Sequence, residues 1–417
     1  MNALIKSATL VDSKSDFHNK TVDILIENGR IAKISKTIAN PKNYREIQLP
    51  NLHVSQGWFD SSVSFGEPGY EERETITNGL SVAAKSGFTA VALNANANPI
   101  IDNYAAIALV KSKASDNAVS LYPIGALTKG SCSEDLAELF DMKNAGAVAF
   151  YDYQKPIANP NLMKIGLQYA SNFKGLVCSF PQESQISGLG VVNEHINSTK
   201  LGLKGNPALA EELQVARDLF LLEYTESKLH IPTISTAKSV ELIRAAKAKK
   251  LNVTCSVAIH NLIFTDAVLQ DFDTNYKVLP PLRTQPDCDA LIKGLKDGTI
   301  DMVTTDHNPI DIEHKKIEFD FAKYGTIGLE SAFGALQTLF TTKKTIALLT
   351  QGKSRFGGTE STINEGELAD LSLFNPDTNY KFSTAHILSK SKNSAFLGTP
   401  LKGETYGIIA NNKIILK

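Results

Sequence analysis

The residue types that do chemistry rarely occur in this sequence at spacings that define a site by themselves. The clearest candidate is the segment TTDHNP, in which Asp306 precedes His307 at the end of an apolar run. A carboxylate followed by a histidine at a strand end can serve as a metal ligand or as a general base. The structural alternative is that Asp306 caps the next helix or turn.

Histidine and cysteine spacings do not point to a metal site. The eight histidines form neither a His-x-His pair nor the HExxH spacing of a helical zinc site, and catalytic zinc usually needs three protein ligands. The four cysteines lie far apart, and Cys178 and Cys255 fall inside apolar strand patterns. The sequence therefore predicts no disulfide framework and no zinc knot, as is typical of a reducing cytoplasm.

Alternating strands and helices are predicted to position these residues. Short apolar runs alternate with helical patterns, including helices at 75–87, 207–227 and 236–250, as in βα units with a parallel sheet. The predicted strands are 54–65, 89–96, 119–127, 147–152, 175–180, 228–235, 252–259 and 300–306. Eight such units predict an α/β fold with a (β/α)8 TIM-like barrel, whose chemistry would lie at the carboxyl ends of the strands.

The two ends of the chain have a different pattern. Residues 1–52 and 353–417 contain short strand patterns with turn signals such as Asn28-Gly29. We expect these two segments to pair into one small β-sandwich domain beside a barrel domain of residues 53–352.

Composition narrows the range of partners and locations. Of the 417 residues, 42% are hydrophobic and 21% are charged, with a formal net charge of -1, so nothing favours nucleic acid or an anionic membrane as a partner. No apolar run approaches the roughly 18 residues that span a bilayer. The apolar run at the N-terminus is too short for a signal peptide. We therefore expect a cytoplasmic protein.

The segment FDSSVSFGEPGYEERETI, residues 59–76, resembles the opening of the dihydroorotase active site, where the pattern reads Asp-x-His-x-His-Phe-Arg-Glu-Pro-Gly. The segments LGLKGNPALAEELQVARDL, KVLPPLRTQPDCDALIKGLKDGTIDMVTTDHNP and YGTIGLESAFGAL resemble later parts of that family in the same order. The similarity to long-type dihydroorotases of the amidohydrolase superfamily runs nearly end to end. It implies a barrel of the metal-dependent amidohydrolase type and a sandwich formed by the termini.

The resemblance also implies where the family's metal ligands would fall. Active members hold two zinc ions through four histidines and two acidic residues. The corresponding positions here are Ser62, Ser64, Asp152, Ser179, Thr233 and Asp306. All four histidine positions carry hydroxyl side chains, which are poor ligands for Zn²⁺ beside imidazole or carboxylate. We therefore expect no metal and no other cofactor, although the active relatives use zinc.

The positions that the family uses for substrate are also altered. Asn96 falls on the family's substrate-binding asparagine, and Asp306 falls on its general-base position, both as vestiges of the site. The arginine expected to pair with the substrate carboxylate is replaced by Gly66, which removes a bidentate contact. Ile310 and Leu279 replace a histidine and an asparagine of the family pattern.

The resemblance leaves more than one function open. The first hypothesis is a catalytically inactive dihydroorotase-like protein of pyrimidine biosynthesis, acting as a structural or regulatory partner of aspartate transcarbamoylase, since inactive homologues are known that hold that enzyme in its assembly. We also expect a homo-oligomer. The second hypothesis is a weak or divergent dihydroorotase, or another cyclic amidohydrolase, with a reduced site of Asp152, Asp306 and His307. The third is a metal-free sensor of dihydroorotate or carbamoyl aspartate.

Overall fold

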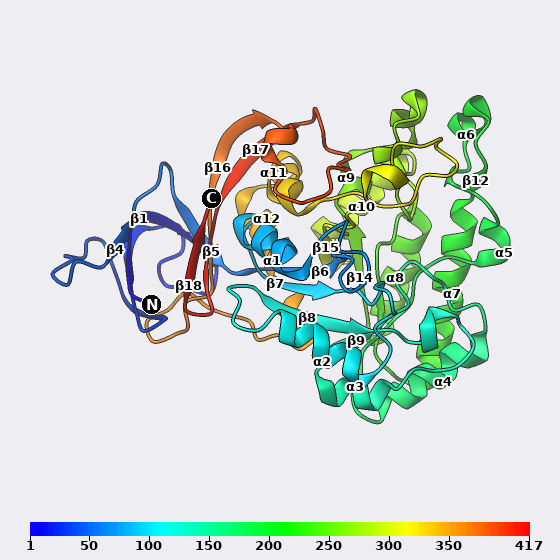
Figure 1. The fold of residues 1–417 in the computed structure, drawn as a ribbon, viewed down its shortest axis with the longest axis horizontal. Helices are drawn as coiled ribbons and strands as arrows, with labels where there is room; N and C mark the ends of the chain where they lie inside the picture. Colours follow the sequence, from blue (N-terminus) through cyan, green and yellow to red (C-terminus); the bar gives the residue numbers. More distant parts are fainter.

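Eight parallel strands, one from each predicted βα unit, form the larger sheet of the protein (Figure 1). The computed structural model describes residues 1–417. The strands are β6 (Trp58–Val63), β7 (Phe88–Leu93), β8 (Ser120–Gly125), β9 (Ala149–Phe150), β10 (Val177–Cys178), β13 (Leu229–Ile231), β14 (Val253–Ala258) and β15 (Met302–Thr304). Each overlaps a strand predicted from the sequence, and the sheet order follows the chain order from β6 to β15. The predicted α/β barrel is confirmed.

The first and last strands of this sheet, β6 and β15, meet and close the barrel. Ser64 donates its backbone N–H to the carbonyl of His307 at 2.7 Å, beside an isolated parallel bridge. Asp60 of β6 accepts hydrogen bonds from the hydroxyl groups of Thr304 and Thr305 across the same seam. Burial raises the pKa of Asp60, while these hydroxyl donors favour its charged form. The seam is therefore held by a side-chain carboxylate as well as by the backbone.

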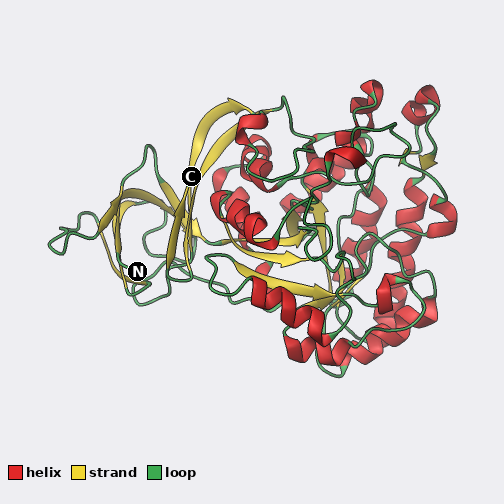
Figure 2. Ribbon diagram, in the orientation of Figure 1, coloured by secondary structure: helices red, strands yellow, loops and turns green.

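Helices surround the barrel strands (Figure 2). They are α1 (Ile76–Lys85), α2 (Tyr104–Lys113), α3 (Leu139–Ala145), α4 (Pro160–Ser171), α5 (Ser184–Ser187), α6 (Ile196–Leu201), α7 (Ala208–Thr225), α8 (Ala237–Ala248), α9 (His260–Ile263), α10 (Gln285–Asp297), α11 (Leu329–Leu339) and α12 (Thr342–Thr350). Threonine hydroxyls cap several of them, as Thr75 does for α1 and Thr236 for α8. The three helices predicted by range correspond to α1, α7 and α8.

Short 3-10 helices complete the connections. The 3-10 helices are η1 (Lys129–Ser131), η2 (Asp266–Asp271), η3 (Thr274–Tyr276), η4 (Ile312–His314), η5 (Lys353–Phe356) and η6 (Thr384–His386). Two short strands, β11 (Val192–Asn193) and β12 (Gly205–Asn206), pair with each other outside the barrel sheet.

Both ends of the chain meet in a second sheet, seen in blue and red at the left of Figure 1. Its strands are β1 (Ala3–Val11), β2 (Thr21–Glu27), β3 (Arg30–Ser35), β4 (Arg45–Ile47), β5 (His53–Gln56), β16 (Leu371–Lys381), β17 (Pro400–Ala410) and β18 (Lys413–Leu416). The order is β18-β17-β16-β5-β1-β2-β3, with β4 also paired to β1. The pairing of the two termini is thus observed as one continuous sheet, and the two-layer sandwich stays a prediction.

The division between the two parts differs from the predicted boundaries. Residues 53–56, which the prediction gave to the barrel, form β5 and pair with β1 and β16 in the terminal sheet. The sequence run looks continuous into β6, but the structure divides it at Gly57, where a Cβ would lie 2.1 Å from side-chain atoms of Thr89 and Asp370. In the other direction, Phe382 and Phe396 of the C-terminal segment belong to the barrel core.

The four cysteines are all free; Cys178, Cys255 and Cys288 are buried, and Cys132 is exposed. Among the helices of this chain, we find none with the length and apolar character needed to cross a membrane.

Candidate functional site

The six positions that the resemblance assigns to metal ligands lie at or just beyond the carboxyl ends of barrel strands, as expected. They are Ser62 and Ser64 at the end of β6, Asp152 after β9, Ser179 after β10, Thr233 after β13 and Asp306 after β15. All six side chains are buried. Their hydrogen-bond partners divide them into two groups, and only one group surrounds Asp306.

Asp306 is the centre of the first group. Its Oδ1 accepts hydrogen bonds from the Ser62 hydroxyl at 2.9 Å and from the Tyr153 hydroxyl at 3.1 Å. Its Oδ2 accepts a longer bond of 3.4 Å from the amide of Gln154, which also donates to the carbonyl of Leu279 at 2.8 Å. The carboxylate is only 4% exposed. The hydrogen bonds that this carboxylate accepts therefore come from protein groups.

The two serines extend this group through two asparagines. Asn94 donates its amide to the hydroxyls of Ser62 at 3.0 Å and Ser64 at 3.2 Å, and Ser64 donates to Oδ1 of Asn96 at 2.9 Å. The predicted residue Asn96 therefore does lie at the site. Sequence reasoning missed Asn94, which directly follows β7 at its carboxyl end.

Asp152 does not belong to this group, contrary to the expectation that two carboxylates remain together. Its Oδ1 accepts the backbone N–H groups of Leu127 at 2.8 Å and Thr128 at 3.1 Å, and its Oδ2 accepts the Thr128 hydroxyl. The neighbouring Tyr153 takes the place beside Asp306. β9 ends at Phe150, and beyond it Asp152 binds the residues that follow β8, whereas Tyr153 and Gln154 in the next turn both reach Asp306.

Ser179 and Thr233 are also engaged elsewhere. The Ser179 hydroxyl donates to Oδ2 of Asp218 at 2.6 Å, and Asp218 in turn pairs with Arg217 at 2.7 Å. Thr233 adopts a left-handed conformation with φ of 49° and donates its backbone N–H to the Ser256 hydroxyl at 3.2 Å. No hydrogen bond joins either residue to Asp306.

Burial controls protonation at the site. It raises the pKa of Asp306 to about 7 and raises the pKa of Tyr151 and Tyr153 well above their ordinary value. It lowers the pKa of His307 to about 4. Asp306 is therefore the group of this cluster that changes charge near neutral pH.

This shift predicts a pH-dependent stability. The folded chain keeps a proton on Asp306 that the unfolded chain, with an ordinary pKa of 3.8, has lost, so stability should fall as the pH rises from about 4 to 7 and level off above. In urea unfolding at pH 5 and pH 8, Asp306→Asn should show a smaller fall than the wild type. An identical fall in both proteins would assign the pH dependence to the other buried acids.

The donor set does not fit the zinc pair of the family. No group of three or more His, Cys, Asp or Glu side chains lies close enough to hold a metal ion. Around Asp306 the remaining donors are serine and tyrosine hydroxyls and side-chain amides, whereas zinc sites use imidazole, thiolate and carboxylate. The side chains at these positions therefore do not match the donor set of that zinc pair.

Three substrate-binding positions of the family carry a glycine and two apolar residues in this chain. Gly66, at the position of the family's arginine, has φ of 97°, and a Cβ there would lie 2.7 Å from the carbonyl oxygen of Tyr70. Side chains are strained in that conformation. Ile310 and Leu279 are both buried. These three positions therefore supply no cation for a substrate carboxylate, and the backbone disfavours an arginine at position 66.

His307 has a structural role in this arrangement. Its Nδ1 accepts the backbone N–H groups of Gly328 at 3.2 Å and Leu329 at 3.4 Å, where α11 begins. An Nδ1 that accepts must be unprotonated, which agrees with the lowered pKa of this ring. The structural alternative for Asp306 was that it caps the next helix or turn. His307 performs that role instead, at the start of α11.

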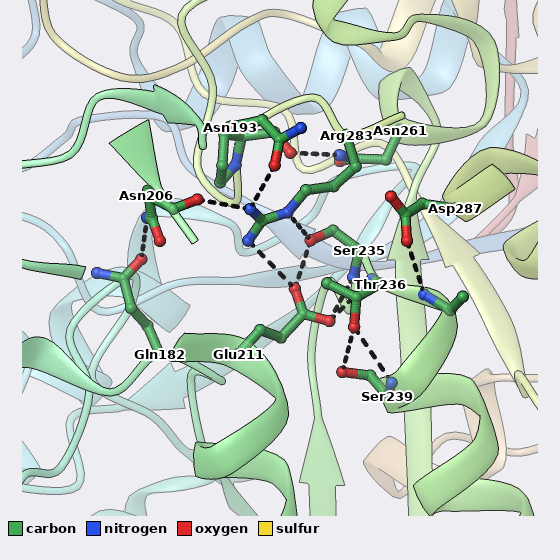
Figure 3. A network of polar contacts seen from close by, with 12 residues as sticks. Gln182, Asn193, Asn206, Glu211, Ser235, Thr236, Ser239, Asn261, Arg283 and Asp287 are labelled. Carbon is green, nitrogen blue, oxygen red and sulfur yellow. Dashed lines mark hydrogen bonds and ion pairs between the residues drawn. The ribbon is translucent and has the colours of Figure 1, made fainter. Parts of the chain in front are cut away.

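A second buried polar network lies among the loops that follow β10, β13 and β14 (Figure 3). Arg283 is its centre: Nε donates to the Ser235 hydroxyl at 3.1 Å, and Nη1 donates to Oδ1 of Asn193 at 3.0 Å and to the carbonyl of Asn206 at 2.7 Å. Its Nη2 lies 3.9 Å from the carboxylate of Glu211 on α7. This network fixes the loops that border the site through Nε and Nη1 of the guanidinium.

Comparison with known proteins identifies similar sequences. The chain matches the family described as Dihydro-orotase-like over residues 53–239. It is 40% identical over 424 residues to the dihydroorotase of Pelotomaculum thermopropionicum, covering 100% of this chain and 99% of that relative. It is 37% identical over 424 residues to the dihydroorotase of Geobacter metallireducens, with 100% of both chains covered.

Solved structures give the same fold. The L-hydantoinase (dihydropyrimidinase) of Arthrobacter aurescens aligns with a TM-score of 0.86 at 20% identity, over 100% of this chain and 97% of that chain. The D-hydantoinase (dihydropyrimidinase) of Thermus sp. aligns with a TM-score of 0.83 at 20% identity, over 100% and 95%. At this identity the likeness shows a shared architecture only.

Proposed function

We propose, since this chain belongs to the dihydroorotase family, that it is a catalytically silent member of that family and acts as a structural or regulatory partner of aspartate transcarbamoylase in pyrimidine biosynthesis. The observation that carries the first part is the state of Asp306. This carboxylate is buried and accepts hydrogen bonds from Ser62, Tyr153 and Gln154. A general base must lie within hydrogen-bond distance of the proton that it removes. Here the carboxylate oxygens of Asp306 already accept hydrogen bonds from protein groups.

The absence of suitable ligands supports the same proposal. Water bound to catalytic zinc ionises near pH 7, whereas free water has a pKa of about 15.7. The hydroxyl groups of Ser62, Ser64, Ser179 and Thr233 cannot replace four imidazoles as zinc ligands. Hydroxide would therefore be scarce at neutral pH, and Gly66 provides no charge for the substrate carboxylate.

The second part of the proposal extends the resemblance to inactive homologues that hold aspartate transcarbamoylase in its assembly. Mixing the two purified proteins should give a complex that elutes before either component in size-exclusion chromatography with light scattering. A stable assembly should persist at concentrations of about 1 μM. The expected complex contains both chains in a fixed ratio, and its transcarbamoylase activity should differ from that of the free enzyme.

A matched control is the dihydroorotase of a curated relative mixed with the same transcarbamoylase, which separates a property of this chain from a general property of the fold. If no complex forms up to about 50 μM, far above the Kd range of stable assemblies, this partner is wrong. That outcome would not bear on catalytic silence, which the assay of dihydroorotate hydrolysis tests separately.

The second candidate function is a weak or divergent dihydroorotase, or another cyclic amidohydrolase, with a reduced site at Asp306. The comparisons favour this candidate, because curated dihydroorotases align with the whole chain at up to 40% identity. Its signature would be turnover of dihydroorotate to N-carbamoyl-aspartate that a chelator abolishes. Asp152 is not available to it without breaking the contacts with Leu127 and Thr128.

A further inference from the structure

A polar cavity lies at the junction between the terminal sheet and the barrel. Its volume is about 530 Å³, and only 4 of its 16 lining residues are hydrophobic. The turns β2–β3 and β17–β18 contribute Gly29 and Asn412 from the terminal sheet, and β8 contributes Ser120 and Tyr122 from the barrel. We name it the junction cavity. Its size lies within the range of about 300–1,000 Å³ that small-molecule sites have.

The junction cavity is at the opposite end of the barrel strands from Asp306. Thr89 and Ser120, which line it, stand at the amino ends of β7 and β8, whereas Asp306 follows the carboxyl end of β15. In Figure 1, β7 and β8 begin beside the terminal sheet and run away from it. A ligand in this cavity would therefore touch neither Asp306 nor the hydrogen-bond partners of that carboxylate.

An ion pair with unused hydrogen-bonding capacity forms one wall of the cavity. Lys353 of η5 is 9% exposed, and its Nζ donates to Oδ2 of Asp370 at 2.8 Å. An ammonium group has three N–H donors, and this is the only hydrogen bond that the Lys353 side chain makes within the protein. The other carboxylate oxygen of Asp370, Oδ1, accepts none. Two donors and one acceptor therefore remain for a molecule in the cavity.

The hydroxyl of Tyr122 adds a third uncommitted group. It forms no hydrogen bond within the protein, and neither it nor Oδ1 of Asp370 is among the fully buried polar atoms that lack a partner, so a ligand can reach both atoms. A Cβ placed on Gly358 would lie 2.6 Å from Cγ of Lys353 and 3.1 Å from the Tyr122 hydroxyl. The three side chains thus converge on one region of the cavity.

The walls of the junction cavity are held in place by hydrogen bonds of the protein itself. Asn411 donates its amide to the carbonyl of Ala118 and to the Ser120 hydroxyl, each at 3.1 Å, which ties the β17–β18 turn to the start of β8. The carbonyl of Asp370 accepts the backbone N–H of Gly57 at 2.9 Å. Binding would therefore require little reorganisation of the protein, which favours affinity.

The charges around the cavity disfavour ionic ligands. Lys353 is the only lysine or arginine in the lining, which also contains three carboxylates, Glu360, Glu367 and Asp370. Glu360 is already paired with Lys14 at 2.5 Å. The carboxylates repel an anion, and the Lys353 ammonium repels a metal ion or an organic cation at the same wall. A neutral polar molecule is the class of ligand that these groups favour.

We propose that the junction cavity binds a small polyhydroxylated ligand, a cyclic sugar or polyol, through two adjacent hydroxyl groups. One hydroxyl donates to Oδ1 of Asp370 and its neighbour accepts from the Lys353 ammonium, since a hydroxyl group can both donate and accept. The Tyr122 hydroxyl binds a third hydroxyl of the ligand. Because the ligand contacts the barrel and the terminal sheet together, it stabilises their junction.

Saturation-transfer difference NMR of the full chain tests the class of ligand. The probes are myo-inositol and D-ribose, as free polyols, and adenosine, as a sugar attached to a larger group. At least one of them should bind with a Kd of about 1 mM or below. Cyclohexanol and adenine are the matched controls, because they lack adjacent hydroxyls, and neither should give a signal. Binding of adenosine alone would assign an attached sugar, and binding of inositol or ribose would assign a free one.

Two substitutions test the location of the bound probe. Tyr122→Phe should raise the Kd about five-fold, as expected for one hydrogen bond, and should leave the fold intact because the hydroxyl has no partner in the protein. Asp370→Asn keeps the size of the side chain and should raise the Kd about ten-fold or more, because a charged acceptor is lost. The matched control is Tyr104→Phe, since Tyr104 is 53% exposed on α2 and lies outside the cavity.

Three outcomes would overturn the proposal. One is the absence of saturation transfer to all three probes at about 20 mM, well above the expected Kd. Another is a signal from cyclohexanol or adenine as strong as that of the polyhydroxylated probes. The third is binding that Tyr122→Phe and Asp370→Asn weaken no more than Tyr104→Phe does, which would place the probe elsewhere on the protein. If Asp370→Asn fails to fold, Tyr122→Phe decides the location by itself.

Discussion

Purified protein supplied with Zn²⁺ is expected to hydrolyse dihydroorotate at least about 10⁴-fold more slowly than an active dihydroorotase, because it lacks both metal-activated water and a free general base. Asp306 is the only predicted acidic ligand at the centre of the site, and its contacts are with Ser62, Tyr153 and Gln154. Metal analysis of the same sample should find less than about 0.1 zinc per chain after dialysis. Carbamoyl aspartate formation is the activity to measure.

The dihydroorotase of Pelotomaculum thermopropionicum, 40% identical to this chain, is the natural positive control in that assay. It should lose activity when a chelator is added, whereas the signal of this protein should not change. Stoichiometric zinc together with chelator-sensitive turnover in this protein would reject catalytic silence and support the second candidate function.

Glu211→Ala is expected to lower the free energy of unfolding by about 3–5 kcal/mol, because it leaves the buried guanidinium of Arg283 without its countercharge. Glu211 lies 3.9 Å from Arg283 and also accepts the backbone N–H groups of Ser235 at 2.8 Å and Thr236 at 3.0 Å. Both side chains of the ion pair are almost fully buried. Urea unfolding followed by circular dichroism measures the change.

Glu212→Ala is the matched control, since Glu212 is the next residue of the same helix and is only partly buried. Its effect should stay below about 1 kcal/mol, as for substitutions that disrupt no buried network. Equal midpoints for the two variants would show that the contacts of Glu211 contribute no net stability.

The periodicity of the sequence predicted the barrel strands because each is a buried apolar run bounded by helical patterns, and all eight appear in order. The boundary at residue 53 could not be predicted in the same way. The run from Val54 to Phe65 reads as one strand, but the structure divides it between two sheets at Gly57, where Thr89 and Asp370 approach too closely for a larger residue. That approach depends on residues distant in sequence.

The sequence predicted where along the chain the site residues lie, but not which of their side chains contact one another. Strand ends and family pattern placed Ser62, Ser64 and Asp306 together, and the hydrogen bonds agree. Tyr153 was missed because its partner, Asp306, is 153 residues away and because an aromatic side chain gives no metal-site signal. Asp152 was assigned to the site because it falls on the acidic ligand position of the family pattern, which does not show that its carboxylate binds Leu127 and Thr128.

The position of β5 has a consequence for synthesis of the chain. β5 lies between β1 and β16 in the terminal sheet, so one of its edges has no partner until residues 371–381 have left the ribosome. An unpaired edge can pair with a wrong strand, and contacts of such long sequence separation form slowly. We expect the nascent protein to expose this edge throughout translation of the barrel, which makes it a natural binding site for chaperones.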